Sequence, residues 1–160
     1  MLTASYQYKG IASVWYPRGA GVGRGLRESK PLEIGKARTV REGEKIAFLN
    51  FGTLLPEVQQ AAEALNASVI DMRFVKPLDT QAIEDTVAKH DSLVTVEENV
   101  TAGGAGSAVL EYLADKGLSI PVLQLGLPDE FIKHGSQAEI RTELNLDAKG
   151  IEAQVKTRFF

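Results

Sequence analysis

The chain has 160 residues and a formal net charge of −3, a length that fits one ordinary domain with a little left over. Its 44% hydrophobic and 24% charged residues are typical of a soluble globular protein. No apolar run approaches the roughly 20 residues of a membrane-spanning helix. The lack of cysteine excludes disulfides, thiolate catalysis and cysteine-based zinc sites, and the two histidines, His90 and His134, lie too far apart to suggest a histidine metal site.

The first 34 residues predict part of one element followed by a linker. Residues 11–16 form a strand-like run with too little chain before it to build the sheet that such a strand needs. A glycine-rich stretch at 19–25 and Pro31, which cannot continue a strand ladder, indicate a linker or a loop over a surface. The first residues lack the basic and then apolar layout of a signal peptide, so we expect a cytoplasmic protein.

From residue 37 onward, compact apolar runs alternate with stretches of helical periodicity. Strands are expected at 37–41 (a short edge strand), 46–51, 68–75, 93–96 and 121–125. Helices are expected from Pro56 to Asn66, from Asp79 to His90, from 103–106 to Gly117, at 136–144 with a Ser136–Glu139 capping box, and from Asp147 to about Arg158. This alternation predicts an α/β fold with a mostly parallel sheet covered on both faces, and functional loops at the carboxyl ends of the strands.

Several residues at these strand ends are candidates for a site. Glu97 and Glu98 are neighbours on extended chain and point in opposite directions, so they do not by themselves form an acid–base pair, and one of them could cap the next helix. The glycines at 103–106 could hold an anion on free N–H groups or let a helix pack closely. Arg73 is expected to form a structural ion pair, and His134 is either a titrating group or a solvated loop residue.

The sharpest candidate for ligand binding is Arg18. Pro17 fixes the backbone before it, Gly19 allows a ligand to approach closely, and a guanidinium suits bidentate recognition of a phosphate. We therefore predict that Arg18 binds an anionic ligand such as a phosphate.

Five motifs occur here in one order, over nearly the whole chain. They are YPRG at 16–19, NFGT at 50–53, DMRFVKPLD at 71–79, VTVEEN at 94–99 with GGAGS at 103–107, and GLPDEFI at 126–132 with HG at 134–135. Together they resemble the carboxyl-terminal portion of the 1-deoxy-D-xylulose 5-phosphate synthases, a family of transketolase-like thiamine-diphosphate enzymes. The resemblance implies a three-layer α/β/α domain at 35–160, whose five-stranded sheet has one antiparallel edge strand. Residues 1–34 would then be the tail of the pyrimidine-binding middle domain plus a linker.

The resemblance also implies a holoenzyme that condenses pyruvate with glyceraldehyde 3-phosphate, with loss of CO2, for isoprenoid, thiamine and pyridoxal synthesis. Thiamine diphosphate and Mg²⁺ would be held by earlier domains, so this chain alone should bind neither and should be inactive. It would contribute Arg18, as a ligand for the phosphate of glyceraldehyde 3-phosphate, and a surface of the homodimer. No nucleic acid or membrane partner is expected.

One residue departs from the family pattern. The family usually has arginine before the YPRG motif, and this chain has Trp15, which removes a charge from the neighbourhood of Arg18. Two alternatives remain open at this point: a stand-alone, non-catalytic interaction module of the same fold, and the same domain from a sister enzyme such as transketolase. The motifs argue against the sister enzymes, and the reading frame upstream of Met1 would decide between the fragment and the module.

Overall fold

The computed structural model describes residues 1–14, 16 and 30–160. Its strands are β1 (Arg38–Arg41), β2 (Glu44–Phe51), β3 (Ala67–Asp71), β4 (Ser92–Val100) and β5 (Val122–Leu127). They form one five-stranded sheet of order β1-β3-β2-β4-β5. Only β1 runs antiparallel to its neighbour, so the expected mostly parallel sheet with one antiparallel edge strand is confirmed.

The described helices are α1 (Leu2–Gln7), α2 (Leu55–Leu65), α3 (Thr80–Val87), α4 (Ala105–Asp115), α5 (Gln137–Glu143) and α6 (Ala148–Phe159). Four of their boundaries follow from local signals in the sequence. Asn66 ends α2 in the left-handed conformation, with φ of 50°. The Asp79 and Asp147 side chains accept N–H bonds at the starts of α3 and α6, and the Ser136–Glu139 capping box opens α5 as expected.

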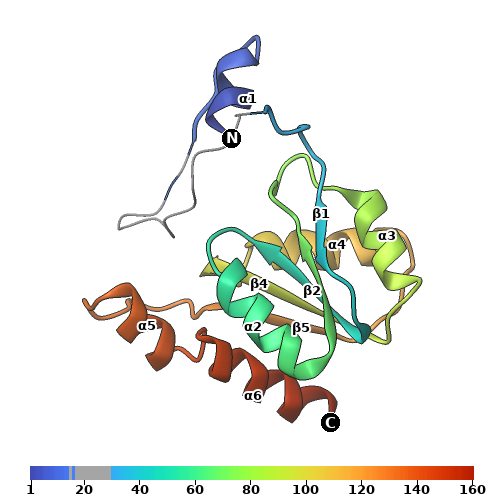
Figure 1. Ribbon diagram of the computed structural model, residues 1–160, viewed down its shortest axis with the longest axis vertical. Coiled ribbons are helices and arrows are strands. Elements are labelled where there is room, and N and C mark those ends of the chain that lie inside the picture. The colour runs from blue at the N-terminus through green and yellow to red at the C-terminus, as the bar shows by residue number, and fades with distance from the viewer. Residues whose placement is uncertain (15, 17–29) are drawn as a thin grey trace.

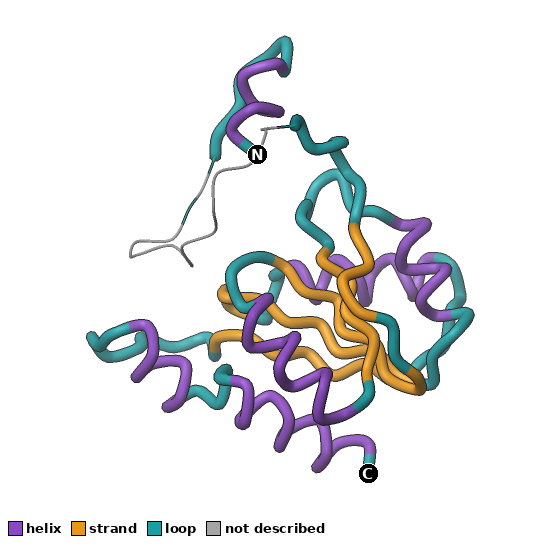
Figure 2. Tube along the Cα trace, viewed as in Figure 1, coloured by secondary structure: helices purple, strands orange, loops and turns teal. Residues whose placement is uncertain are grey.

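The hydrophobic core lies in two layers, one on each face of the sheet. Successive residues of the central strand β2 point to opposite faces, so Phe48 packs toward α2 and α6 while Leu49 packs toward α3 and α4. Figures 1 and 2 show α2 and α6 side by side along one face. The three-layer α/β/α architecture is thus confirmed. Because both clusters lie within residues 35–160, this part of the chain carries its own core.

Three element boundaries differ by three residues or more from the sequence-based expectation. The strand expected to reach residue 75 ends at Asp71, because Arg73 has a φ of 60° and takes the chain out of the ladder. The helix expected to reach His90 ends at Val87. The strand expected at 93–96 continues to Val100, because β2 pairs with it as far as Glu97 and β5 pairs with it at Val100.

The start of the chain also differs from expectation. Within the strand-like run at 11–16, residues 11–14 and Tyr16 are described, and none of them is in a strand. A strand needs a neighbour to complete its hydrogen bonds, and the described sheet begins at β1. The short helix α1 was not expected. The division of the chain at residue 34 stays a prediction.

Candidate functional site

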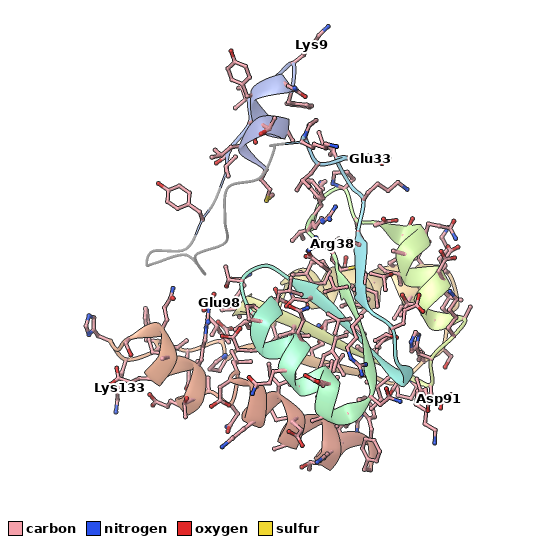
Figure 3. The ribbon with its side chains drawn as sticks, in the orientation of Figure 1. Lys9, Glu33, Arg38, Asp91, Glu98 and Lys133 are labelled. Carbon is pink, nitrogen blue, oxygen red and sulfur yellow. The ribbon has the colours of Figure 1, made fainter. Side chains whose placement is uncertain are left out.

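A cavity of about 510 Å³ opens at the carboxyl ends of β2, β3 and β4, and we call it the carboxyl-edge hollow. Its walls are formed by Tyr16, Phe51, Gly52, Thr53, Arg73, Val75, Glu97, Glu98, Asn99, Gly103, Gly104, Ala105 and Ala108. The carboxyl ends of three strands, where the sequence predicts functional loops, therefore meet here. The carboxyl end of β5 instead contributes Leu127 to a separate cavity of about 340 Å³. Figure 3 places Glu98 and Asp91 at opposite ends of the sheet.

Glu97 is the buried floor of the hollow. Only 3% of its surface is exposed, and its two carboxylate oxygens accept N–H bonds from Ala105 and Gly106, each at 2.8 Å. These N–H groups belong to the first turn of α4, where a negative charge is favoured by the partial positive charge of the helix end. The prediction that one of the two glutamates caps this helix is confirmed.

The same contacts decide between the two hypotheses for the glycine run. A Cβ atom on Gly104 would lie 2.4 Å from Oε2 of Glu97, and one on Gly106 would lie 2.5 Å from Oγ1 of Thr95. The glycines therefore let α4 approach β4 closely. The N–H groups of Ala105 and Gly106 that could have held an external anion are already bonded to Glu97.

Glu98 points away from Glu97 and joins a separate network. It accepts bonds from Thr53 and from Arg141, whose Nη2 lies 3.0 Å from Oε1 of Glu98. The Nη1 atom of Arg141 donates to Glu57 at 2.7 Å, so one guanidinium ties α5 to both β4 and α2. The two adjacent carboxylates have different partners and form no acid–base pair. Sequence reasoning missed Arg141, because its partners lie 43 and 84 residues away and no local pattern links them.

Arg73 is the one cation among the described residues that line the hollow. Its Nε atom lies 3.7 Å from Oδ2 of Asp71, and the same oxygen lies 2.9 Å from Nη2 of Arg38. The expected ion pair is present. It is a long one, because Asp71 is already engaged more closely by Arg38.

The family model described as "Transketolase, C-terminal domain" matches residues 35–151. The chain belongs to the transketolase C-terminal domain family. The 1-deoxy-D-xylulose-5-phosphate synthase of Idiomarina loihiensis is 65% identical over 155 residues, which cover 97% of this chain and 25% of that protein. The synthases of Serratia proteamaculans and Hahella chejuensis are 55% and 54% identical, over 98% and 99% of this chain and 25% of each relative. The chain thus spans about a quarter of the length of these curated relatives, and the resemblance drawn from the motifs is confirmed.

Solved structures give the same fold for this transketolase C-terminal domain. One, described as "Split gene transketolase, inactive beta4 tetramer", has a TM-score of 0.77 and 27% identity over 87% of this chain and 47% of that one. A 2-oxoglutarate:ferredoxin oxidoreductase from Magnetococcus marinus shares the fold alone, with a TM-score of 0.50 and 12% identity over 77% of this chain and 19% of that one.

The remaining candidates of this transketolase C-terminal domain do not converge on the hollow. His134 lies exposed in the loop before α5, and His90 bonds to the Thr86 carbonyl and the Ser68 hydroxyl near β1.

The described residues contain no group of three or more His, Cys, Asp or Glu side chains placed to hold a metal ion. No described helix is long and apolar enough to cross a bilayer. Arg18 and Trp15 lie outside the described residues, although Tyr16 of the same motif lines the hollow.

Proposed function

We propose that this chain is the carboxyl-terminal quarter of a 1-deoxy-D-xylulose 5-phosphate synthase. The observation that carries the proposal is the 65% identity to such a synthase across 97% of the chain. The family domain at 35–151 supports it, as does the order of the five motifs. The same identity argues against a sister enzyme that merely shares the domain.

In this proposal the whole enzyme joins pyruvate to glyceraldehyde 3-phosphate. The two three-carbon substrates yield a five-carbon ketose phosphate and one CO2. The ketose phosphate supplies isoprenoid, thiamine and pyridoxal synthesis. The cofactors are thiamine diphosphate and Mg²⁺, and the enzyme is a cytoplasmic homodimer. Bound thiamine diphosphate supplies the carbanion chemistry, and the protein positions the substrates around it.

The described residues of this chain do not fit that cofactor. Among residues 1–14, 16 and 30–160 there is no cluster of metal-binding side chains. At the start of α4, the N–H groups of Ala105 and Gly106, which could otherwise meet a diphosphate, bind Glu97. We propose that the groups that hold the cofactor belong to the rest of the polypeptide, and we assign no catalytic step to this chain.

The chemical contribution proposed for this chain is Arg18. Its guanidinium would bind the phosphate of glyceraldehyde 3-phosphate through paired hydrogen bonds, which fixes the acceptor carbonyl for attack. The support is the position of Arg18 in the YPRG motif at 16–19.

The test is the longer reading frame and its product. The frame that continues upstream of Met1 should encode the remaining three quarters of a synthase. The purified protein should then release CO2 from pyruvate only when glyceraldehyde 3-phosphate, thiamine diphosphate and Mg²⁺ are all present. A frame without cofactor motifs would instead support a stand-alone interaction module of this fold. CO2 release that is indifferent to glyceraldehyde 3-phosphate would contradict the proposed acceptor.

A further inference from the structure

A second cavity, of about 270 Å³, lies between α3 and the edge strand β1, and we call it the edge slot. Figure 1 shows α3 beside β1, on the far side of the domain from α5 and α6. The slot shares no lining residue with the carboxyl-edge hollow, and the proposed function uses none of its residues. Its volume is close to the lower end of the roughly 300–1,000 Å³ that is common for cavities that take small ligands.

A buried side chain bridges the walls of the slot at each of its ends. At one end, the carboxylate of Asp79 accepts the N–H of Ala37 at 2.8 Å, which ties the start of α3 to the residue before β1. At the other end, Nε2 of His90 lies 2.8 Å from the buried hydroxyl of Ser68, and this hydroxyl accepts the N–H of Gly43 at 2.9 Å. The slot is therefore formed before any ligand enters, so binding needs little reorganisation of the protein.

Four charged side chains line the slot and have hydrogen-bonding capacity left. Arg38 uses only its Nη2 atom, which lies 2.9 Å from Oδ2 of Asp71. Asp85 accepts a single hydrogen bond, at Oδ1. The side chains of Lys89 and Glu42 have no hydrogen-bond or ion-pair partner among the described residues. The slot thus presents two cations and two carboxylates, and a ligand that carries one charge of each sign complements both kinds.

Apolar groups line the slot between these charges. Ile70 comes from β3 and is only 5% exposed, and Ala82 comes from the first turns of α3. An aliphatic group placed against Ile70 and Ala82 would be removed from water together with them, which favours binding. The ligand that fits the slot is therefore small, carries both charges and has an aliphatic part.

We propose that the edge slot binds a free α-amino acid with an aliphatic side chain, such as leucine or valine. Arg38 holds the carboxylate of the amino acid with its unused N–H donors, since a guanidinium matches a carboxylate in shape and charge. Asp85 accepts from the ammonium group, and the side chain rests on Ile70 and Ala82. This site does not depend on the proposed function, because every group that forms it belongs to the described part of this chain.

The test is calorimetric titration of this chain with leucine, valine, 4-methylpentanoate and 3-methylbutylamine. The last two compounds are leucine without its ammonium group and leucine without its carboxylate. Leucine should bind about tenfold more tightly than either of them, because each lacks one charged hydrogen-bonding group. Hydrogen–deuterium exchange with leucine present should slow at 37–43 and 80–90, on the two walls of the slot. No binding of either amino acid at concentrations on the order of 10 mM, or equal binding of leucine and its two analogues, would overturn the proposal.

Two variants separate the two charged ends of the ligand. Asp85→Asn should weaken the binding of leucine about tenfold and leave that of 4-methylpentanoate no weaker, whereas Arg38→Ala should weaken both. Arg158→Ala is the matched control, since Arg158 is an exposed arginine on α6, and it should change neither. Unchanged amide exchange in β2 verifies that the variants are folded. Leucine binding that survives both Asp85→Asn and Arg38→Ala would place the amino acid elsewhere and overturn the proposal.

Discussion

Replacing Glu97 by glutamine tests whether a buried carboxylate anchors α4 to the sheet. The change keeps the shape of the side chain but removes its charge. In the unchanged protein two N–H donors lie 2.8 Å from the carboxylate oxygens of Glu97, and in the variant the new NH2 group would face one of these donors. One charged hydrogen bond contributes about 1.5–3 kcal/mol. The charge at the helix end contributes about 0.3–1 kcal/mol, and up to about 2 kcal/mol when partly buried.

These contributions overlap, so we expect the free energy of unfolding to fall by about 2–4 kcal/mol for Glu97→Gln. That is a large fraction of the roughly 5–15 kcal/mol that a domain possesses. Urea denaturation at neutral pH, followed by circular dichroism, measures the effect. Glu111→Gln is the matched control, since Glu111 is an exposed glutamate on the same helix, and it should change stability by less than about 0.5 kcal/mol. A loss for Glu97→Gln no greater than the control would refute the anchoring role.

Three further predictions concern binding, turnover and pH. This chain alone should neither bind thiamine diphosphate with Mg²⁺ in calorimetry nor form product; micromolar binding would contradict the fragment hypothesis. In the full-length enzyme, Arg18→Ala should lower kcat/KM for glyceraldehyde 3-phosphate about ten- to a hundredfold, and an equal loss for pyruvate would argue against a phosphate ligand. The hydrogen bond to Glu84 raises the pKa of Tyr112 above its ordinary 10.0. The contribution of this hydrogen bond to the stability of the fold should therefore be fully present below pH 10 and be lost as pH rises through the raised pKa. A Tyr112→Phe variant whose stability falls with alkaline pH in the same way as that of the unchanged protein would contradict this.

The order and type of the elements from residue 37 onward could be predicted from the sequence, because the signals for them are local. Apolar runs marked the buried strands, and side-chain caps such as Asp79, Asp147 and the Ser136–Glu139 box marked helix starts. A cap acts within a few residues of its helix, so it can be recognised without knowing what the helix packs against. The motifs were equally local, and their order alone indicated the family.

The ends of the strands and the pairing of charged side chains could not be predicted from the sequence and follow from the three-dimensional fold. β4 runs on to Val100 because β2 pairs with it up to Glu97 and β5 pairs with it at Val100, while β3 stops at Asp71 where the chain turns away. Arg141 reaches across 43 and 84 residues of sequence to Glu98 and Glu57. Strand pairing and ion pairing depend on distance in space, and the folding of the whole chain sets that distance, so residues far apart in sequence carry no local mark of their partnership.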